Sequence, residues 1–191
     1  MLTTLEKAKQ MLGMRGGVGV VNDTLLSTYI TVASQQIEAY CKRKFRKQDY
    51  TEYHDGGQHT INLLHLPIHD VHHVKGPSGS LPYKLLKAQG SIYCPYGFPA
   101  GKYGIEITYN GGYVLPGEAT EDNPQTLPEA IEMACILLVK DLLYESTRVQ
   151  GIESERLDVM QVKYRQEKKA TVSQLPLHVV ALLSPYVSRW V

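Results

Sequence analysis

The sequence predicts an α+β protein that is mainly α-helical, a small helical bundle that carries a β-rich insertion with antiparallel hairpins. Two observations predict this class. Apolar residues recur at helical spacing in three segments, 1–47, 126–150 and 173–191. Residues 48–113 hold short runs of Tyr, Ile, Val and Thr, separated by turn-forming glycines and prolines. We therefore expect a single domain over residues 1–191, with the three helical segments as its core.

The first helical segment is expected to contain two helices. Thr3 and Glu6 form a capping-box pattern ahead of a short apolar run, which a glycine-rich stretch ends. The second helix should begin at Asn22 or Asp23, because both side chains accept hydrogen bonds from the free amides of a first turn. Cations are favourable at a helix C-terminus, so the basic run 42–47 is expected to close it. The apolar positions of this helix are Leu26, Ile30, Ala33, Ile37 and Tyr40/Cys41.

The insertion has the alternation expected of half-buried strands. Apolar and polar residues alternate over 60–63 and 105–109, and glycine-rich turns lie between such runs. Four prolines favour edges and loops over long central strands, because proline cannot donate to a strand ladder. These are Pro67, Pro82, Pro95 and Pro99.

The last third of the chain begins with a second capping-box pattern, Thr126 to Glu129. Residues 130–144 are apolar on most of the helix circumference and predict the central core helix, in which Leu138 should be buried. Alternation over 155–165 predicts one strand. Residues 175–190 predict a final helix that a proline bends or ends.

Composition narrows the function classes. Twenty basic and nineteen acidic residues give a net charge of +1, so the whole molecule has no strong electrostatic preference for nucleic acid. No apolar stretch approaches the roughly 20 residues of a membrane span, and no signal-peptide pattern opens the chain. The three cysteines lack paired spacing and are expected to be free thiols.

Six of the seven histidines lie in 54–73, which raises the possibility of a metal site or a small enzyme. No cysteine lies near them, and the chain contains no catalytic group of recognised spacing. We therefore expect surface and loop histidines, no metal, no cofactor and no catalytic residue; a pH-sensitive interface is a third possibility. The six are His54, His59, His65, His69, His72 and His73.

Three groups of residues together resemble the head–tail connector (adaptor) proteins of tailed phages. The first is Asn22-Asp23 ahead of an amphipathic helix that ends in Ile37-Glu38-Ala39-Tyr40-Cys41. The second is Ile107 to Tyr113, followed by Leu127-Pro128-Glu129-Ala130-Ile131 and the long apolar helix. The third is Gly151 to Arg156, then Leu175-Pro176 and Leu182-Leu183-Ser184-Pro185-Tyr186. Two segments depart from the pattern: 15–21 is glycine-rich where an acidic turn is usual, and 54–102 is longer than in minimal members.

The resemblance implies a structural virion protein without catalytic activity. Such adaptors form a ring of about twelve subunits beneath the portal protein, extend the DNA channel and dock a stopper or tail-completion protein. DNA passes through without sequence recognition, and no membrane is involved. The expected location is the virion neck, after synthesis in the host cytoplasm. A stopper or tail-completion protein is the alternative in the same system.

Two sets of residues are candidates for contacts. The basic residues Lys42, Arg43, Lys44, Arg46 and Lys47 either line the DNA channel or form a solvated helix end. In adaptors of the family, the C-terminal segment contributes to portal attachment. We therefore expect Tyr186, Arg189 and Trp190 to bind the portal, while Leu182 and Leu183 pack on the subunit's own core. Thirteen tyrosines, several in the insertion, favour further subunit or partner contacts.

Overall fold

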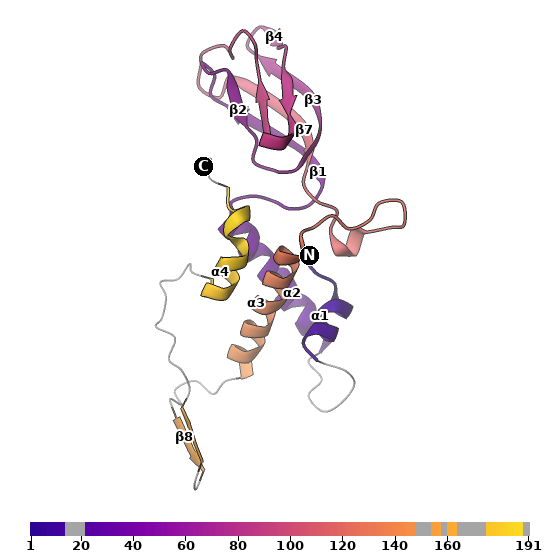
Figure 1. Ribbon diagram of the computed structural model, residues 1–191, viewed down its shortest axis with the longest axis vertical. Helices are drawn as coiled ribbons and strands as arrows, with labels where there is room; N and C mark the ends of the chain where they lie inside the picture. Colours follow the sequence, from indigo (N-terminus) through magenta and orange to yellow (C-terminus); the bar gives the residue numbers. More distant parts are fainter. Residues whose placement is uncertain (14–21, 148–153, 158–159, 164–174, 189–191) are drawn as a thin grey trace.

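The computed structural model describes residues 1–13, 22–147, 154–157, 160–163 and 175–188. Within them the chain is an α+β protein with four α-helices and antiparallel sheets, in agreement with the predicted mixture of helices and strands. The strands of the insertion lie at one end of an elongated molecule, the helices lie in its middle, and the strand Ser154–Leu157 lies at the other end (Figure 1). The helices and the insertion each have their own cluster of buried hydrophobic residues.

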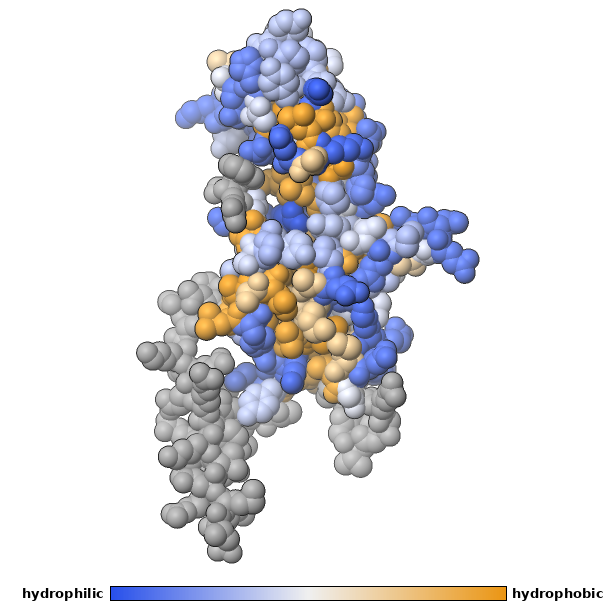
Figure 2. Space-filling model, in the orientation of Figure 1, coloured by the Kyte–Doolittle hydropathy of each residue, from blue (hydrophilic) through white to orange (hydrophobic). Residues whose placement is uncertain are grey.

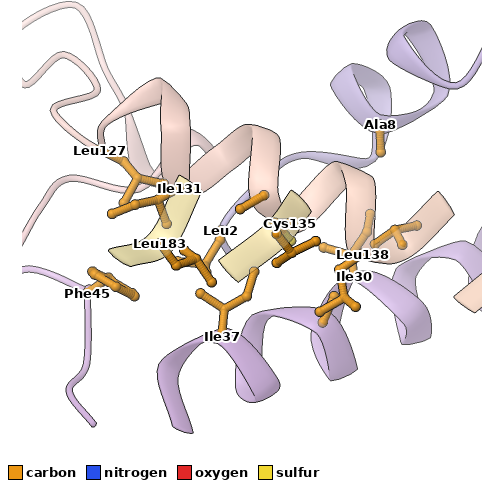
Figure 3. Packing of buried hydrophobic residues seen from close by; sticks show 14 of the residues in the cluster. Leu2, Ala8, Ile30, Ile37, Phe45, Leu127, Ile131, Cys135, Leu138 and Leu183 are labelled. Carbon is orange, nitrogen blue, oxygen red and sulfur yellow. The ribbon is translucent and has the colours of Figure 1, made fainter. Parts of the chain in front are cut away.

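The helical part is built on two long helices packed against each other. They are α2, Asp23–Cys41, and α3, Glu129–Thr147; α1, Leu5–Met11, and α4, Leu177–Leu183, pack against them. Ile37 of α2 and Ile131 and Cys135 of α3 point into one shared core (Figure 3). Leu138 is buried in that core, as expected of a central-helix position.

The starts of α1 and α3 differ from the predicted capping boxes. Thr4, not Thr3, caps α1, and its hydroxyl accepts from the Lys7 amide at 3.2 Å. The Thr126 hydroxyl accepts from the Val114 amide at 2.9 Å instead of capping α3. Both predictions were wrong for the same reason. The Thr3 hydroxyl binds Glu132 and the Thr126 hydroxyl binds Val114, so neither is used to cap a helix. The start of α2 is confirmed: Asn22 Oδ1 accepts from the Thr24 amide at 3.0 Å.

The end of α2 also differs from the prediction, because the helix stops before the basic run. Lys42 adopts a left-handed conformation with φ of 54°. The amides of Lys42 and Arg43 donate to the carbonyls of Ala39 and Glu38, both at 3.2 Å, which is the Schellman arrangement. Residues 42–47 therefore connect α2 to the first strand and do not form the last helical turn.

The insertion folds as two small antiparallel sheets around one core. Alternate residues of β7, Ile105, Ile107 and Tyr109, are buried in it, as the alternation predicted. One sheet has the order β1-β7-β3-β4 and the other β2-β6-β5. The strands are β1 Gln48–His54, β2 Thr60–Asn62, β3 Ile68–Gly76, β4 Gly79–Ser80, β5 Lys84–Leu86, β6 Ser91–Tyr93 and β7 Ile105–Gly111. None of the four prolines lies inside a strand.

The strand predicted over 155–165 is a hairpin instead. Two strands, β8 (Ser154–Leu157) and β9 (Met160–Lys163), pair antiparallel. A hairpin and a single strand have the same period of two, so alternation alone could not locate the turn.

Candidate interaction surfaces

Two chain segments, 42–47 and 112–116, join the helical part to the strands. They are hydrogen-bonded to each other: the Tyr113 amide donates to the Phe45 carbonyl at 2.7 Å, and the Lys47 amide to the Tyr113 carbonyl at 2.8 Å. Gly112 has φ of 97°, and a Cβ there would lie 2.4 Å from the Arg46 carbonyl oxygen. Only glycine allows this close crossing.

Arg43 is part of the inside of this junction. Its side chain lies over two aromatic rings, 4.9 Å from the Phe45 centroid and 6.0 Å from that of Tyr113. The residue is 8% exposed, and its Nε has no hydrogen-bond partner among the residues that the structure describes. A buried guanidinium against aromatic faces stabilises the junction through cation–π contact. Arg43 is therefore not a surface charge in the subunit, unlike the other four basic residues of the segment.

The remaining basic residues lie on the outside of the junction. Lys44 Nζ lies 2.8 Å from Glu38 Oε2, and Arg46 Nε lies 2.7 Å from Glu118 Oε1. Lys42 and Lys47 are exposed, and neither makes an ion pair within the described residues. These four, Lys42, Lys44, Arg46 and Lys47, form what we call the basic junction.

The C-terminal segment lies beside the same junction. The Ser188 amide donates to the carbonyl of Cys41, the last residue of α2, at 3.0 Å. Leu183 is fully buried and Leu182 packs against the same cluster, so their predicted role in the subunit's own core is confirmed. Tyr186, in the 3₁₀ turn Ser184–Tyr186, is half-buried. Arg189 and Trp190 lie outside the described residues.

The six clustered histidines are held by separate partners. Three lie near carboxylates: His54 by Glu52 at 2.8 Å, His72 by Asp49 at 3.1 Å and His73 by Glu106 at 3.1 Å. Two others lie near backbone carbonyls, His59 by that of Cys94 and His69 by that of Gly112. His65 accepts from the Lys44 amide at 3.1 Å. No group of three or more possible metal ligands occurs in the part of the chain that the structure describes.

A buried carboxylate in the insertion is a feature that the sequence reasoning missed. Glu52 accepts hydrogen bonds from the Tyr109 hydroxyl and the Leu64 amide, and lies beside His54. Burial, together with the Glu52 charge, raises the pKa of Tyr109 well above its usual value. The network joins β1 to β7 and to the loop after β2. The sequence could have predicted that Glu52 is buried. Alternate residues of a strand face the same side, and Glu52 lies two positions after the buried Tyr50.

The tyrosines of the insertion are partly surface residues. Tyr96 is 87% exposed and Tyr103 73% exposed, and Tyr103 has a positive φ of 50°. Tyr53 and Tyr83 are also exposed. The subunit thus leaves several tyrosines uncovered, and their use in subunit or partner contacts stays a prediction.

No curated protein sequence matches the chain. The structure is similar to a chain in the neck of an empty gene transfer agent (GTA) particle, determined with C6 symmetry. The TM-score is 0.59 at 15% identity, over 100% of this chain and 91% of that chain. A chain of a native GTA virion has a TM-score of 0.61 at 16% identity, with the same two coverages.

A third similar chain comes from the neck of a native GTA particle with C12 symmetry, with a TM-score of 0.57 at 15% identity. It covers 98% of this chain and 89% of that one. No helix among the described residues is long and apolar enough to cross a membrane. The model of the head completion protein family matches residues 1–188. The expected resemblance is confirmed, and the chain belongs to the head completion protein family.

Proposed function

We propose that this protein is a structural subunit of the virion neck, a head–tail adaptor that forms a ring beneath the portal. The family match over residues 1–188 carries the proposal, because it covers both the helical part and the insertion. The shared fold with chains from GTA necks of C6 and C12 symmetry supports a ring of about twelve copies. The stopper or tail then docks on the side of the ring away from the head.

The ring would extend the channel through which packaged DNA passes. The basic junction supports this role, because its four cations lie at the surface and repeat in every copy. Contacts of Lys and Arg with phosphates are independent of base sequence, as a passing genome requires. A net charge of +1 fits a channel wall that does not bind DNA tightly.

Portal attachment belongs to the C-terminal segment in this proposal. Tyr186 is half-buried and follows α4 closely. Because Leu183 of that helix is buried in the core, the segment that would bind the portal begins at an anchored position. Tyr186, Arg189 and Trp190 are of the residue types most enriched at binding hot spots. The Ser188–Cys41 hydrogen bond brings this segment beside the basic junction, at the point where ring and portal would meet.

The role is structural and not catalytic, and it needs no cofactor. The family description refers to completing the head, not to a reaction. Each clustered histidine has a hydrogen-bond partner within the subunit, which supports a structural role for these side chains.

Electron microscopy of the purified protein mixed with its portal tests the proposal. We expect a ring of density directly below the portal, coaxial with its channel. Binding to the tail-side protein but not to the portal would instead identify a stopper or tail-completion protein. Binding to neither would contradict a neck role.

A further inference from the structure

The outer face of α2 is an exposed helix surface without charge. Six residues spaced three or four apart lie on it, opposite the buried positions Leu26, Ile30 and Ile37. Leu25 is 45% exposed and Val32 36% exposed. The set, which we call the α2 face, is Leu25, Thr28, Val32, Gln35, Gln36 and Ala39, all of them exposed. It covers about four helical turns.

The absence of charge on the α2 face identifies the kind of partner. Protein surfaces that stay in water usually mix charges of both signs, whereas the centres of protein interfaces are depleted of charge. DNA is excluded as the occupant, because nucleic acid binding requires cations. A second neutral, partly apolar protein surface matches this face in charge.

A second such surface lies on α3. Met133 is 36% exposed, Leu137 is partly buried beside it, and Ala130 lies one turn before them on the same side. Leu177, at the start of the adjacent α4, is 87% exposed. Charged residues border these positions, namely Glu129 and Lys140 on α3 and the His178–Asp141 pair beside Leu177. We call Ala130, Met133, Leu137 and Leu177 the α3 face; hydrophobic side chains are visible over this part of the molecule in Figure 2.

The two faces point in opposite directions. Helices α2 and α3 pack against each other through their buried positions, so the side of each helix opposite those positions faces away from the other helix. In Figure 1, α2 lies behind α3. A subunit with different apolar surfaces on opposite sides associates head to tail, and such contacts close into a ring when the rotation permits.

We propose that the α2 face of one subunit packs against the α3 face of a second copy of this chain. This inference rests on the proposed ring and deepens it, because it names the two surfaces that would hold neighbouring copies together. The basic junction begins three residues after Ala39, the last residue of the α2 face, so its cations lie at the edge of the contact.

Cysteine cross-linking of the full-length chain tests the pairing. The three native cysteines, Cys41, Cys94 and Cys135, are buried, so wild-type protein should give no product with a flexible bis-maleimide under native conditions. The variants are Val32→Cys and Met133→Cys, both at exposed positions. A mixture of the two should give covalent dimers, and a chain that carries both should give a ladder of higher oligomers. Each single variant alone should stay monomeric.

The matched control mixes Val32→Cys with Ser80→Cys, an exposed position on β4 of the insertion, and should give no dimer. Reactions are run on the chain alone at high concentration and on the portal-bound complex. Dimers from either single variant would show an isologous contact and overturn the proposal, as would no product in both samples.

Two results separate this inference from the proposed function. Normal portal docking without a product from the mixed variants overturns the inference alone. Efficient cross-linking by a chain that does not bind the portal overturns the proposed function alone. Thermal unfolding of each variant excludes misfolding, and wild-type midpoints are expected because both sites are at the surface.

Discussion

Glu132 shows how one residue can hold the N-terminal segment in place. It is buried in the first turn of α3 and accepts from Thr3 Oγ1 at 3.1 Å, Lys7 Nζ at 2.7 Å and Gln125 Nε2 at 2.9 Å. The change Glu132→Gln keeps the shape but removes the charge that these donors face. We expect it to cost about 1–3 kcal/mol in the free energy of unfolding, measured with denaturant.

The exposed Glu129, one turn earlier in α3, supplies the matched control. Glu129→Gln should change stability by less than about 0.5 kcal/mol. Equal effects of the two substitutions would show that the Glu132 contacts do not stabilise the fold. Faster proteolysis within residues 1–13 of the Glu132 variant would locate the loss in the N-terminal segment.

His65 gives the insertion a dependence on pH. Its ring stacks on Tyr50 with centroids 3.7 Å apart, and Nδ1 accepts from the Lys44 amide, a bond that a protonated Nδ1 cannot make. Burial lowers the pKa of His65 below its ordinary 6.5, although the Glu52 charge and the Lys44 carbonyl, 3.4 Å from Nδ1, oppose the shift. The unfolded chain therefore binds the proton more readily, so His65 contributes stability above about pH 6.5 that is lost as the pH falls.

The substitution His65→Asn tests this dependence, because an amide oxygen can still accept from Lys44. We expect the free energy of unfolding of the variant to fall less steeply than wild type between pH 7.5 and 5.5. His59→Asn is the control for the substitution itself, because this exposed histidine lies near the backbone carbonyl of Cys94. Parallel curves for His65→Asn and wild type would contradict the assignment.

At the scale of elements, the C-terminal segment has two parts with different roles: α4 packs in the core, and residues 187–191 are proposed to bind the portal. Val179 and Leu183 are fully buried, whereas of the two described residues after Tyr186, Val187 is partly buried against the core and Ser188 donates one backbone hydrogen bond to Cys41. Deletion of residues 187–191 should therefore leave the protein folded. If Trp190 and Arg189 form a hot spot of about 2 kcal/mol, the portal affinity should fall about thirtyfold.

Binding of the truncated chain to immobilised portal measures this loss, with circular dichroism as the check on folding. Ser80→Ala changes an exposed residue of the insertion and should bind the portal normally. If the truncated chain binds the portal with wild-type affinity, residues 187–191 do not contribute to portal binding and this prediction is wrong.

Across the whole molecule, the sequence predicted the elements better than their polar contacts. Helices α2 and α3 and strand β7 were predictable because burial on one side imposes a period on the residues of each element. Thr3 and Glu132 are 129 positions apart, and Thr126 and Val114 meet only in the folded chain, so no local pattern reports these bonds. The spacing of apolar residues also cannot predict that a basic side chain is buried, as that of Arg43 is.

The position of Arg43 sharpens the test of the DNA channel, because the basic run is not one uniform surface. Arg43 is needed at the junction, so the informative variant replaces Lys42, Lys44, Arg46 and Lys47 with glutamine and keeps Arg43. Folding should be preserved, because Lys44 and Arg46 are both exposed and each of the two ion pairs lost contributes at most about 1 kcal/mol.

In a ring of about twelve copies the variant removes roughly four charges per subunit from one circumference. Because contacts of cations with phosphates weaken as salt increases, we expect assembled particles to retain less nuclease-protected DNA, or to release it faster, and the difference from wild type to shrink at high salt. Replacing Lys84, Lys87 and Lys102, which are exposed on the insertion, controls for net charge alone. If both variants package and release DNA like wild type, the basic junction is an ordinary solvated surface and the channel must be lined by other residues.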